Sequence, residues 1–230
     1  MRELALYIDI EGFSFKFENG GKKSFINLTN DLYSLGRSLL SYLSIIQFGG
    51  DGFLIKEIII YRNEISRFID LSAALLQIIT IRGGAGRVQI SHGYMSDISG
   101  LYSDEILKEI HVNNQNILGG CNHNVMLINP IIGTSIIKSY KLKGPKGPLL
   151  LVDKDLKEML EDECIYYETI PYDKSEVLSI NWLKLRNKNI EHFLKQLKLN
   201  SDNIEEVFRI YINNNELTSE WEENAWKLIG

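Results

Sequence analysis

The sequence contains little cysteine and little proline. Among its 230 residues, Cys121 and Cys164 are the only cysteines, and neither belongs to a CxxC pair or to a Cys/His set with zinc spacing. We therefore expect free thiols in a reducing cytoplasm and no disulfide framework.

Basic charge and long apolar runs are also scarce. The formal net charge is −5, which offers no basic surface for a nucleic-acid backbone. No apolar stretch reaches the roughly 18–20 residues that cross a bilayer. The first residues do not resemble a signal peptide, because Arg2 and Glu3 lead directly into a strand-like run. These patterns predict a cytoplasmic protein without a membrane span that does not bind nucleic acid.

Hydrophobic residues make up 44% of the chain and charged residues 24%, as in globular proteins with a substantial core. Strands are expected at 4–10, 45–48, 53–61, 87–95, 125–132 and 148–152, and helices at 28–44, 64–80, 133–143 and 153–162. Residues 96–124 are polar and rich in turn formers, and no element is assigned there. The order predicts an α+β fold with a ferredoxin-like β-α-β-β-α-β core.

The last part of the chain is charged and has helical periodicity. Helices are expected at 190–199, 203–213 and 217–229. We therefore predict a catalytic domain over residues 1–186 and a C-terminal helical extension over residues 187–230.

Two aspartates each lie at the end of an apolar strand and close to glycine. Asp9 lies in Tyr-Ile-Asp-Ile-Glu-Gly-Phe-Ser, and Asp51 lies in Phe-Gly-Gly-Asp-Gly-Phe. A carboxylate at a buried strand end is costly unless a cation meets it. Two such carboxylates on neighbouring strands suit a pair of Mg²⁺ or Mn²⁺ ions that bridge nucleotide phosphates. Taken singly, each aspartate also fits an ordinary turn.

These motifs resemble those of the class III nucleotide cyclases. Residues 7–14 are similar to the F-x-D-I-x-G-F-[ST] opening of that family, and Gly50-Asp51-Gly52 is similar to its second metal motif. Residues 87–93 resemble the R-[IV]-G-I-x-x-G strand, with Gln89 in place of a glycine. Residues 133–142 resemble the G-x-x-V-N-x-A-x-R-L helix. The resemblance covers residues 4–155.

The resemblance implies a role for each matched residue. Asp9 and Asp51 would bind two divalent cations, assisted by the Ile10 carbonyl. The backbone amides of Gly12, Phe13 and Ser14 would hold the β- and γ-phosphates of a nucleoside triphosphate, and Arg87 would contact the triphosphate. The family forms its sites between two chains, so a homodimer with active sites at the interface is implied.

Several positions depart from the family pattern. Ile137 stands at the asparagine position of the helix motif, and Lys141 stands at the catalytic arginine position. Gln47 and Pro130 occupy the two positions that select the base, and neither carries a purine signature. The neutral Gln47 amide suits the edge of a pyrimidine.

A short cyclase with such a base pocket resembles the pyrimidine cyclases of the bacterial Pycsar anti-phage system. The resemblance implies conversion of UTP or CTP to a 3′,5′-cyclic monophosphate and pyrophosphate, which would signal to a separate effector protein. Three alternatives stay open: an adenylate or guanylate cyclase, a diguanylate cyclase of the GGDEF type, and an inactive nucleotide-binding module. Arg87 also fits a plain surface arginine, and His92 fits either an interior position or a site.

Overall fold

A computed structural model describes residues 3–11, 26–31, 34, 44–48, 52–58, 63–113, 117–118, 126–127, 131–142, 145–159, 169–170, 177–200 and 202–230. Among these residues, no helix is long and apolar enough to cross a membrane.

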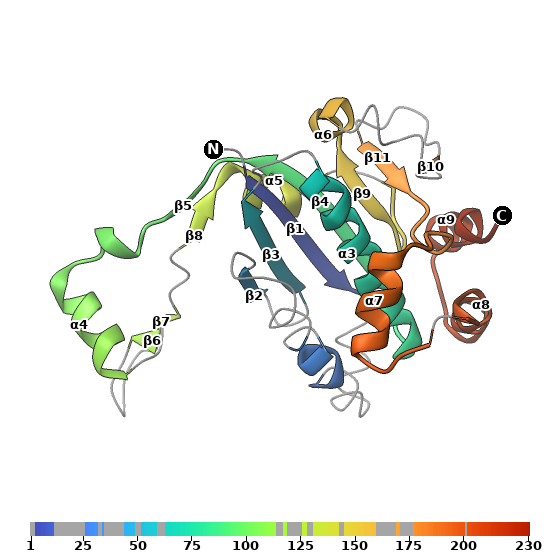
Figure 1. Cartoon of the computed structure of the whole chain (residues 1–230), viewed down its shortest axis with the longest axis horizontal. Helices are drawn as coiled ribbons and strands as arrows, with labels where there is room; N and C mark the ends of the chain where they lie inside the picture. Colours follow the sequence, from blue (N-terminus) through green and yellow to red (C-terminus); the bar gives the residue numbers. More distant parts are fainter. Residues whose placement is uncertain are drawn as a thin grey trace.

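A mixed sheet forms the centre of the molecule (Figure 1). In the described part of the chain it has seven strands in the order β10-β11-β9-β4-β1-β3-β2. Their bounds are β1 Glu3–Ile10, β2 Ser44–Phe48, β3 Gly52–Ile58, β4 Gly86–Gly93, β9 Leu150–Asp153, β10 Thr169–Ile170 and β11 Val177–Ile180. The neighbouring strands β4, β1, β3 and β2 have the ferredoxin-like order, which confirms the predicted α+β class.

Alternation along β1 separates the two faces of the sheet. Leu4, Leu6, Ile8 and Ile10 belong to the main hydrophobic core together with helix α3 (Asn63–Ile81). The intervening Tyr7 instead meets Tyr140 of helix α5 (Thr134–Lys141), with ring centroids 5.3 Å apart. Because successive side chains of a strand point to opposite faces, Asp9 lies on the α5 face of the sheet with Tyr7.

Helix α3 is buried around its whole circumference, as its apolar sequence requires. One side faces the sheet, and the other is covered by α7 (Lys188–Gln196) and α8 (Ile204–Asn214), both of which pack on it. Polar side chains also join these helices: Asp70 of α3 accepts hydrogen bonds from the amides of Asn187 and Asn189. Asn187 also caps α7, because its side chain accepts from the backbone N–H of Asn189 and Ile190.

The other labelled elements are helices α6 and α9 and a group of elements that follows β4. Helix α6 (Lys154–Met159) follows β9, and α9 (Ser219–Ile229) ends the chain. A second group of elements extends away from the sheet (Figure 1). It consists of β5 (Met95–Asp97), η1 (Ser99–Leu101), α4 (Asp104–Asn113), β6 (Ile117–Leu118), β7 (Met126–Leu127) and β8 (Ile131–Gly133).

Most predicted elements are present, and several regions differ from the prediction. The single strand expected at 125–132 is wrong: β7 pairs with β6 and β8 pairs with β5, so two partners divide it. Helix α4 and strands β10 and β11 were not predicted. Of the helix expected at 28–44, residues 26–31 and 34 are helical, strand β2 begins at Ser44, and the rest lies outside the described residues.

Gly133 joins β8 to α5 where two backbones approach closely. A Cβ atom at this position would lie only 2.2 Å from the carbonyl oxygen of Tyr94, so no other residue fits without movement of the chain. The glycine therefore lets α5 start directly beside β5 and lie on the sheet.

We predict that Phe208→Ala destabilises the whole protein. Phe208 is fully buried, and its ring meets Trp182 edge-on at 5.5 Å. Truncation of such a residue costs about 3–5 kcal/mol of unfolding free energy, measurable by urea denaturation. Ile210→Ala is the control on the same helix, because Ile210 is 50% exposed and its truncation should cost about 0.5 kcal/mol or less. Equal losses in the two variants would contradict a shared core.

Candidate active site at the end of strand β1

An acidic and a basic residue lie opposite each other at the end of β1. The antiparallel register pairs Asp9 with Arg87 and Ile10 with Gly86. Both charged side chains are partly exposed. A carboxylate and a guanidinium in such a cross-strand pair attract each other and stay accessible to a ligand.

The second aspartate motif belongs to the hairpin next to β1. Strand β3 begins at Gly52, one residue after Asp51, and the register pairs Phe53 with Ile8 of β1. The start of β3 and the end of β1 are therefore neighbours. Asp51 itself lies outside the described residues, as do Gly12, Phe13, Ser14 and Pro130.

Gln47 lies in β2, where its backbone pairs with Phe53 of β3. Ile10 is 9% exposed and ends β1. The backbone of Gln47 is thus two strands away from Asp9. Gln47 belongs to the β2–β3 hairpin, and Asp51 stands between these two strands in the sequence.

Helix α5 runs along the same face toward the Asp9 end of the sheet. Near its start, the carbonyl of Ser135 accepts a hydrogen bond from the Ser91 hydroxyl at 2.6 Å. Past its end, the carbonyl of Leu142 accepts one from the Gln89 amide at 2.8 Å. Since Gln89 is two residues from Arg87, the exposed Lys141 in the last turn of α5 lies toward the Asp9–Arg87 end.

Glu11 adds a further carboxylate directly after β1. Burial is the main cause that raises the pKa of Glu11, and the negative charge of Asp9 adds to it, while the nearby Trp221 indole and the positive charge of Arg87 lower the pKa. A bound divalent cation would favour the charged form of this carboxyl group.

Arg87 is held among carboxylates but keeps a free donor. Burial lowers its pKa, and the charges of Glu11, Asp9 and Glu220 act in the opposite direction. Its buried Nε has no hydrogen-bond partner among the described residues. A guanidinium with an unused N–H suits a phosphate or carboxylate ligand.

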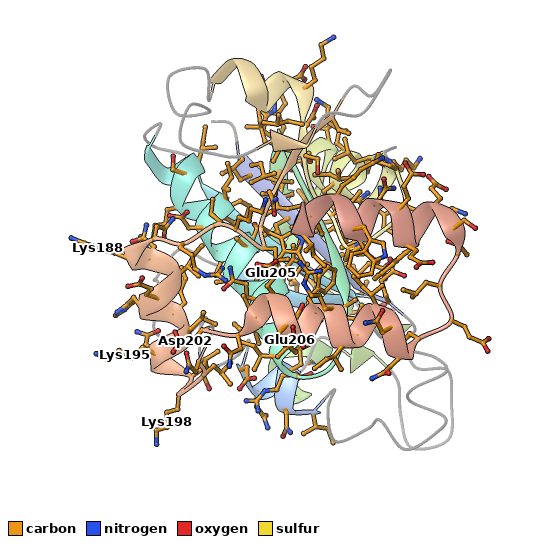
Figure 2. All side chains as sticks on the ribbon, turned by 90° about the vertical axis from the view of Figure 1, so that its right-hand side faces the viewer. Lys188, Lys195, Lys198, Asp202, Glu205 and Glu206 are labelled. Carbon is orange, nitrogen blue, oxygen red and sulfur yellow. The ribbon has the colours of Figure 1, made fainter. Side chains whose placement is uncertain are left out.

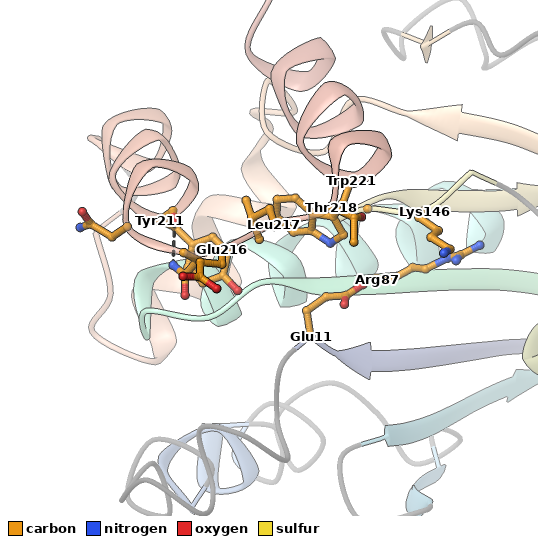
Figure 3. Close-up of a pocket in the computed structure, with 11 residues that line it drawn as sticks. Glu11, Arg87, Lys146, Tyr211, Glu216, Leu217, Thr218 and Trp221 are labelled. Carbon is orange, nitrogen blue, oxygen red and sulfur yellow. Dashed lines mark hydrogen bonds between the residues drawn. The ribbon is translucent and has the colours of Figure 1, made fainter.

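A cavity of about 680 Å³ opens beside Arg87 (Figure 3), within the range of small-molecule sites. Residues of the sheet and of the turn before β9 form one wall, and the segment from α8 to α9 forms the other. The lining residues are Glu11, Arg87, Lys146, Gly147, Tyr211, Asn214, Asn215, Glu216, Leu217, Thr218 and Trp221.

The contribution of the C-terminal helices to this cavity was not predicted. Nothing in the local sequence of Trp221 connects it with Asp9. The two lie 212 positions apart, so that no motif spacing links them. Lys146 is an exposed residue of the cavity wall.

A different acidic group lies at the opposite end of β4. His92, Asp153 and Asp155 bring ligand atoms within 4.8 Å of one another, a spacing that could hold a metal ion. The Lys138 ammonium lies 3.1 Å from Asp155 and 3.7 Å from Asp153. The hydrogen bond to Asp155 is the main cause that raises the pKa of Lys138. Lys138 thus already offsets part of the negative charge of these two carboxylates.

No protein-family model matches the sequence, and no curated protein matches it significantly. Among solved structures, the chain is similar to the adenylyl cyclase CyaB from P. aeruginosa, with a TM-score of 0.51 and 12% identity over 82% of this chain and 96% of that chain. It is also similar to a bacterial light-regulated adenylyl cyclase, with a TM-score of 0.49 and 11% identity over 86% of this chain and 57% of that one. The likeness to CyaB concerns the fold: the chain shares the α+β fold of that adenylyl cyclase.

Proposed function

We propose that the protein is a nucleotide cyclase, which forms a 3′,5′-cyclic nucleotide and pyrophosphate from a nucleoside triphosphate. The observation that carries this proposal is the pairing of Asp9 with Arg87 at the end of β1, beside a strand that begins one residue after Asp51. A carboxylate for a cation and a guanidinium for a phosphate are thereby placed together on a class III cyclase fold.

Two Mg²⁺ or Mn²⁺ ions are the cofactors that this proposal requires. Asp9, Asp51 and the Ile10 carbonyl would hold them, and oxygen donors of this kind suit both metals. Two carboxylates at one partly buried strand end, Asp9 and Glu11, fit a site that receives a cation; burial and then the charge of Asp9 raise the pKa of Glu11. When bound, such ions acidify the 3′-hydroxyl and stabilise the charge on the phosphates.

The chain's own groups would bind and orient the triphosphate. Arg87 offers its unused Nε–H to a phosphate oxygen, and the backbone amides of Gly12, Phe13 and Ser14 would hold the β- and γ-phosphates. Lys141 supplies positive charge from the end of α5, in place of the family's arginine.

The reaction is an in-line displacement at the α-phosphorus. The ribose 3′-oxygen loses its proton and forms a bond to the α-phosphorus. The bond from that phosphorus to the oxygen bridging to the β-phosphate breaks at the same centre, and pyrophosphate leaves. Positive groups aimed at the developing charge lower the barrier because they are already in place.

We further propose that the base is a pyrimidine, so that UTP or CTP is the substrate. This finer assignment depends on Gln47, whose neutral amide replaces the lysine or glutamate of purine cyclases. The product would act as a signal in bacterial anti-phage defence, read by a separate effector protein. Adenylate cyclase activity is the second candidate, because the solved structure of similar fold is an adenylyl cyclase.

A homodimer with shared active sites completes the proposal. Large apolar side chains are exposed on α5 and in the elements that extend from the sheet: Tyr94, Leu101, Ile132, Ile137 and Tyr140, each more than half exposed. An apolar surface of this kind on a monomer is typical of a contact with another protein. Ile137 and Tyr140 lie on α5, which covers the Asp9 face of the sheet, and a second copy bound there would complete each site.

We predict that the purified protein cyclises one of ATP, GTP, CTP and UTP in the presence of Mn²⁺, with the product identified by mass spectrometry. Asp9→Ala should lower kcat by at least about 100-fold, because it removes a ligand of the reacting centre. Asp202→Ala, far from β1 in the α7–α8 turn, serves as the control. A cyclic dinucleotide would favour the GGDEF-type alternative, and no product from any nucleotide would contradict the cyclase proposal.

The base preference provides a separate prediction. Gln47→Ala should reduce the ratio of kcat/KM for the preferred pyrimidine over the other nucleotides by about 10-fold, since a base edge loses its hydrogen-bond partner. Competition assays with mixed nucleotides measure this ratio directly. An unchanged ratio would remove Gln47 from the base pocket.

A substitution that introduces a charged residue on the exposed apolar surface tests the proposed dimer. Ile137→Asp should convert the dimer to monomers in sedimentation velocity, because it buries an unpaired carboxylate in the contact. Ile210→Asp is the matched control, since Ile210 is 50% exposed on α8 and Ile137 is 54% exposed on α5. If the wild-type protein is monomeric, or if both variants stay dimeric, the proposed contact is wrong.

A further inference from the structure

The turn before β9 lies at the same end of the sheet as Arg87, because β4 and β9 run parallel. The register pairs Val88 of β4 with Leu150 of β9, and the Val88 N–H donates to the Leu149 carbonyl at 2.9 Å. Arg87 directly precedes Val88, and Lys146 stands three residues before Leu149. Two basic residues that are far apart in the sequence are thereby brought to one end of the sheet.

Helix α9 holds the backbone of Lys146 by both of its polar groups. The Asn224 side-chain amide donates to the Lys146 carbonyl at 2.6 Å, and the Lys146 N–H donates to the Glu220 carboxylate at 3.2 Å. An added Cβ at Gly147, whose φ is +127°, would lie 3.2 Å from the Cβ of Asn224, so the turn packs closely on the helix. The Lys146 side chain therefore leaves the turn from a fixed point.

Helix α9 is itself fixed to the body of the molecule. The side-chain amide of Asn181, directly after β11, donates to the carbonyl of Leu228 at 3.0 Å. Ala225 and Leu228 are fully buried members of the main core. Figure 2 shows the C-terminal helices packed against the body of the molecule. The anchor of Lys146 is thus a part of the core and keeps its place relative to the sheet.

Both basic side chains keep donor groups for a ligand. The buried Nε of Arg87 has no hydrogen-bond partner among the described residues. The Lys146 ammonium makes no hydrogen bond or ion pair with any residue that the structure describes, because the polar contacts of Lys146 are those of its backbone. Both side chains line the cavity of about 680 Å³ (Figure 3). Two like charges at one cavity repel each other, and an anion bound between them relieves that repulsion.

The rest of the cavity suits a ligand that carries both signs of charge. Glu11 and Glu216 add carboxylates, and Asn214 and Thr218 add an amide and a hydroxyl group. The Thr218 hydroxyl, at the start of α9, makes no capping hydrogen bond. A diphosphate group with bound Mg²⁺ offers anionic oxygens to the basic and neutral donors and a cation to the carboxylates. A ligand with negative charge alone would be repelled by the two carboxylates.

We propose that Lys146 is a second phosphate-binding residue of the active site, which together with Arg87 holds the β,γ-diphosphate end of the nucleotide, and later the pyrophosphate product, in this cavity. The inference rests on the proposed function, which already assigns Arg87 to the triphosphate. It adds the place of the diphosphate, between the sheet and the C-terminal helices. Helix α9 then takes part in substrate binding, because it holds the turn from which Lys146 extends.

Isothermal titration calorimetry of the full chain with pyrophosphate and Mg²⁺ tests the site without any reaction. The wild-type protein should bind pyrophosphate, and Lys146→Gln should weaken the affinity by about 10-fold or more, because a charge-assisted contact is lost. Lys146→Arg keeps the positive charge and should stay within about 3-fold of the wild type. These substitutions leave the anchor intact, since only the backbone of Lys146 is bonded to α9.

Lys188→Gln is the matched control for the loss of one positive charge. Lys188 is an exposed lysine at the start of α7 (Figure 2) and does not line the cavity. Its substitution should change the pyrophosphate affinity by no more than about 2-fold, because salt screens exposed charges that are distant from the ligand. Equal losses in Lys146→Gln and Lys188→Gln would overturn the inference, since they would reflect net charge alone.

Nucleotide kinetics and the anchor give further readouts. Lys146→Gln should raise KM for the preferred nucleotide by about 10-fold while kcat falls less, because the lost contact already binds the ground state. Asn224→Ala removes the donor to the Lys146 carbonyl and leaves the ammonium in place. It should therefore weaken pyrophosphate binding, though less than Lys146→Gln does.

The outcomes separate this inference from the proposed function. Equal pyrophosphate affinity in the wild type and in Lys146→Gln overturns the inference, and so does the absence of pyrophosphate binding by the wild type. If the wild-type protein cyclises no nucleotide, the cyclase proposal fails, and the calorimetry still decides whether Lys146 binds a diphosphate. If the protein is a cyclase and Lys146→Gln changes neither KM nor pyrophosphate affinity, the cyclase proposal stands and the inference fails.

Discussion

The burial of helix α3 is the constraint on which the rest of the structure depends. An apolar helix of this length cannot leave one side in water, because exposure of its side chains would cost more than its hydrogen bonds return. The sheet covers one side, and α7 and α8 cover the other. The C-terminal helices are thus required by the core, and their position brings α9 to the ends of β1 and β4.

Charge is concentrated where these layers meet. Asp9, Glu11 and Arg87 lie within one corner of the sheet, and Glu220 of α9 adds a further negative charge that acts on Arg87. Partly buried carboxylates repel one another more strongly than exposed ones, because less water screens them. Such a corner is expensive for stability alone, and it is chemically suited to a cation and a phosphorylated ligand.

Both ends of β4 lie beside charged side chains, but the two ends differ in how readily a ligand could bind there. At the His92 end, the Lys138 ammonium lies against both Asp153 and Asp155 and offsets part of their negative charge within the chain. At the Arg87 end, the guanidinium retains a buried N–H without a hydrogen-bond partner among the described residues, beside a cavity of about 680 Å³. The second arrangement is the one that a substrate can complete.

The α5 face has a further consequence for assembly. Tyr140 packs on Tyr7 and yet stays 56% exposed, and Ile137 is exposed beside it. A helix that buries one side on the sheet and leaves apolar residues on the other is suited to a second apolar surface. The proposed dimer would place that surface next to Asp9, so that association and the formation of the site become one event.

The sequence by itself determined the alternation of strands and helices, the apolar character of β1 and α3, and the aspartate at the end of β1, because period and turn chemistry are local properties. It also predicted that Arg87 starts a strand, though not that Asp9 lies opposite. The tertiary structure alone decided that pairing, the division of residues 125–132 between two partner strands, and the role of α9 as a wall of the cavity. Trp221 and Glu11 line one cavity although they stand far apart in the chain, and proximity of that kind follows from how helices pack on a sheet, which no local pattern encodes.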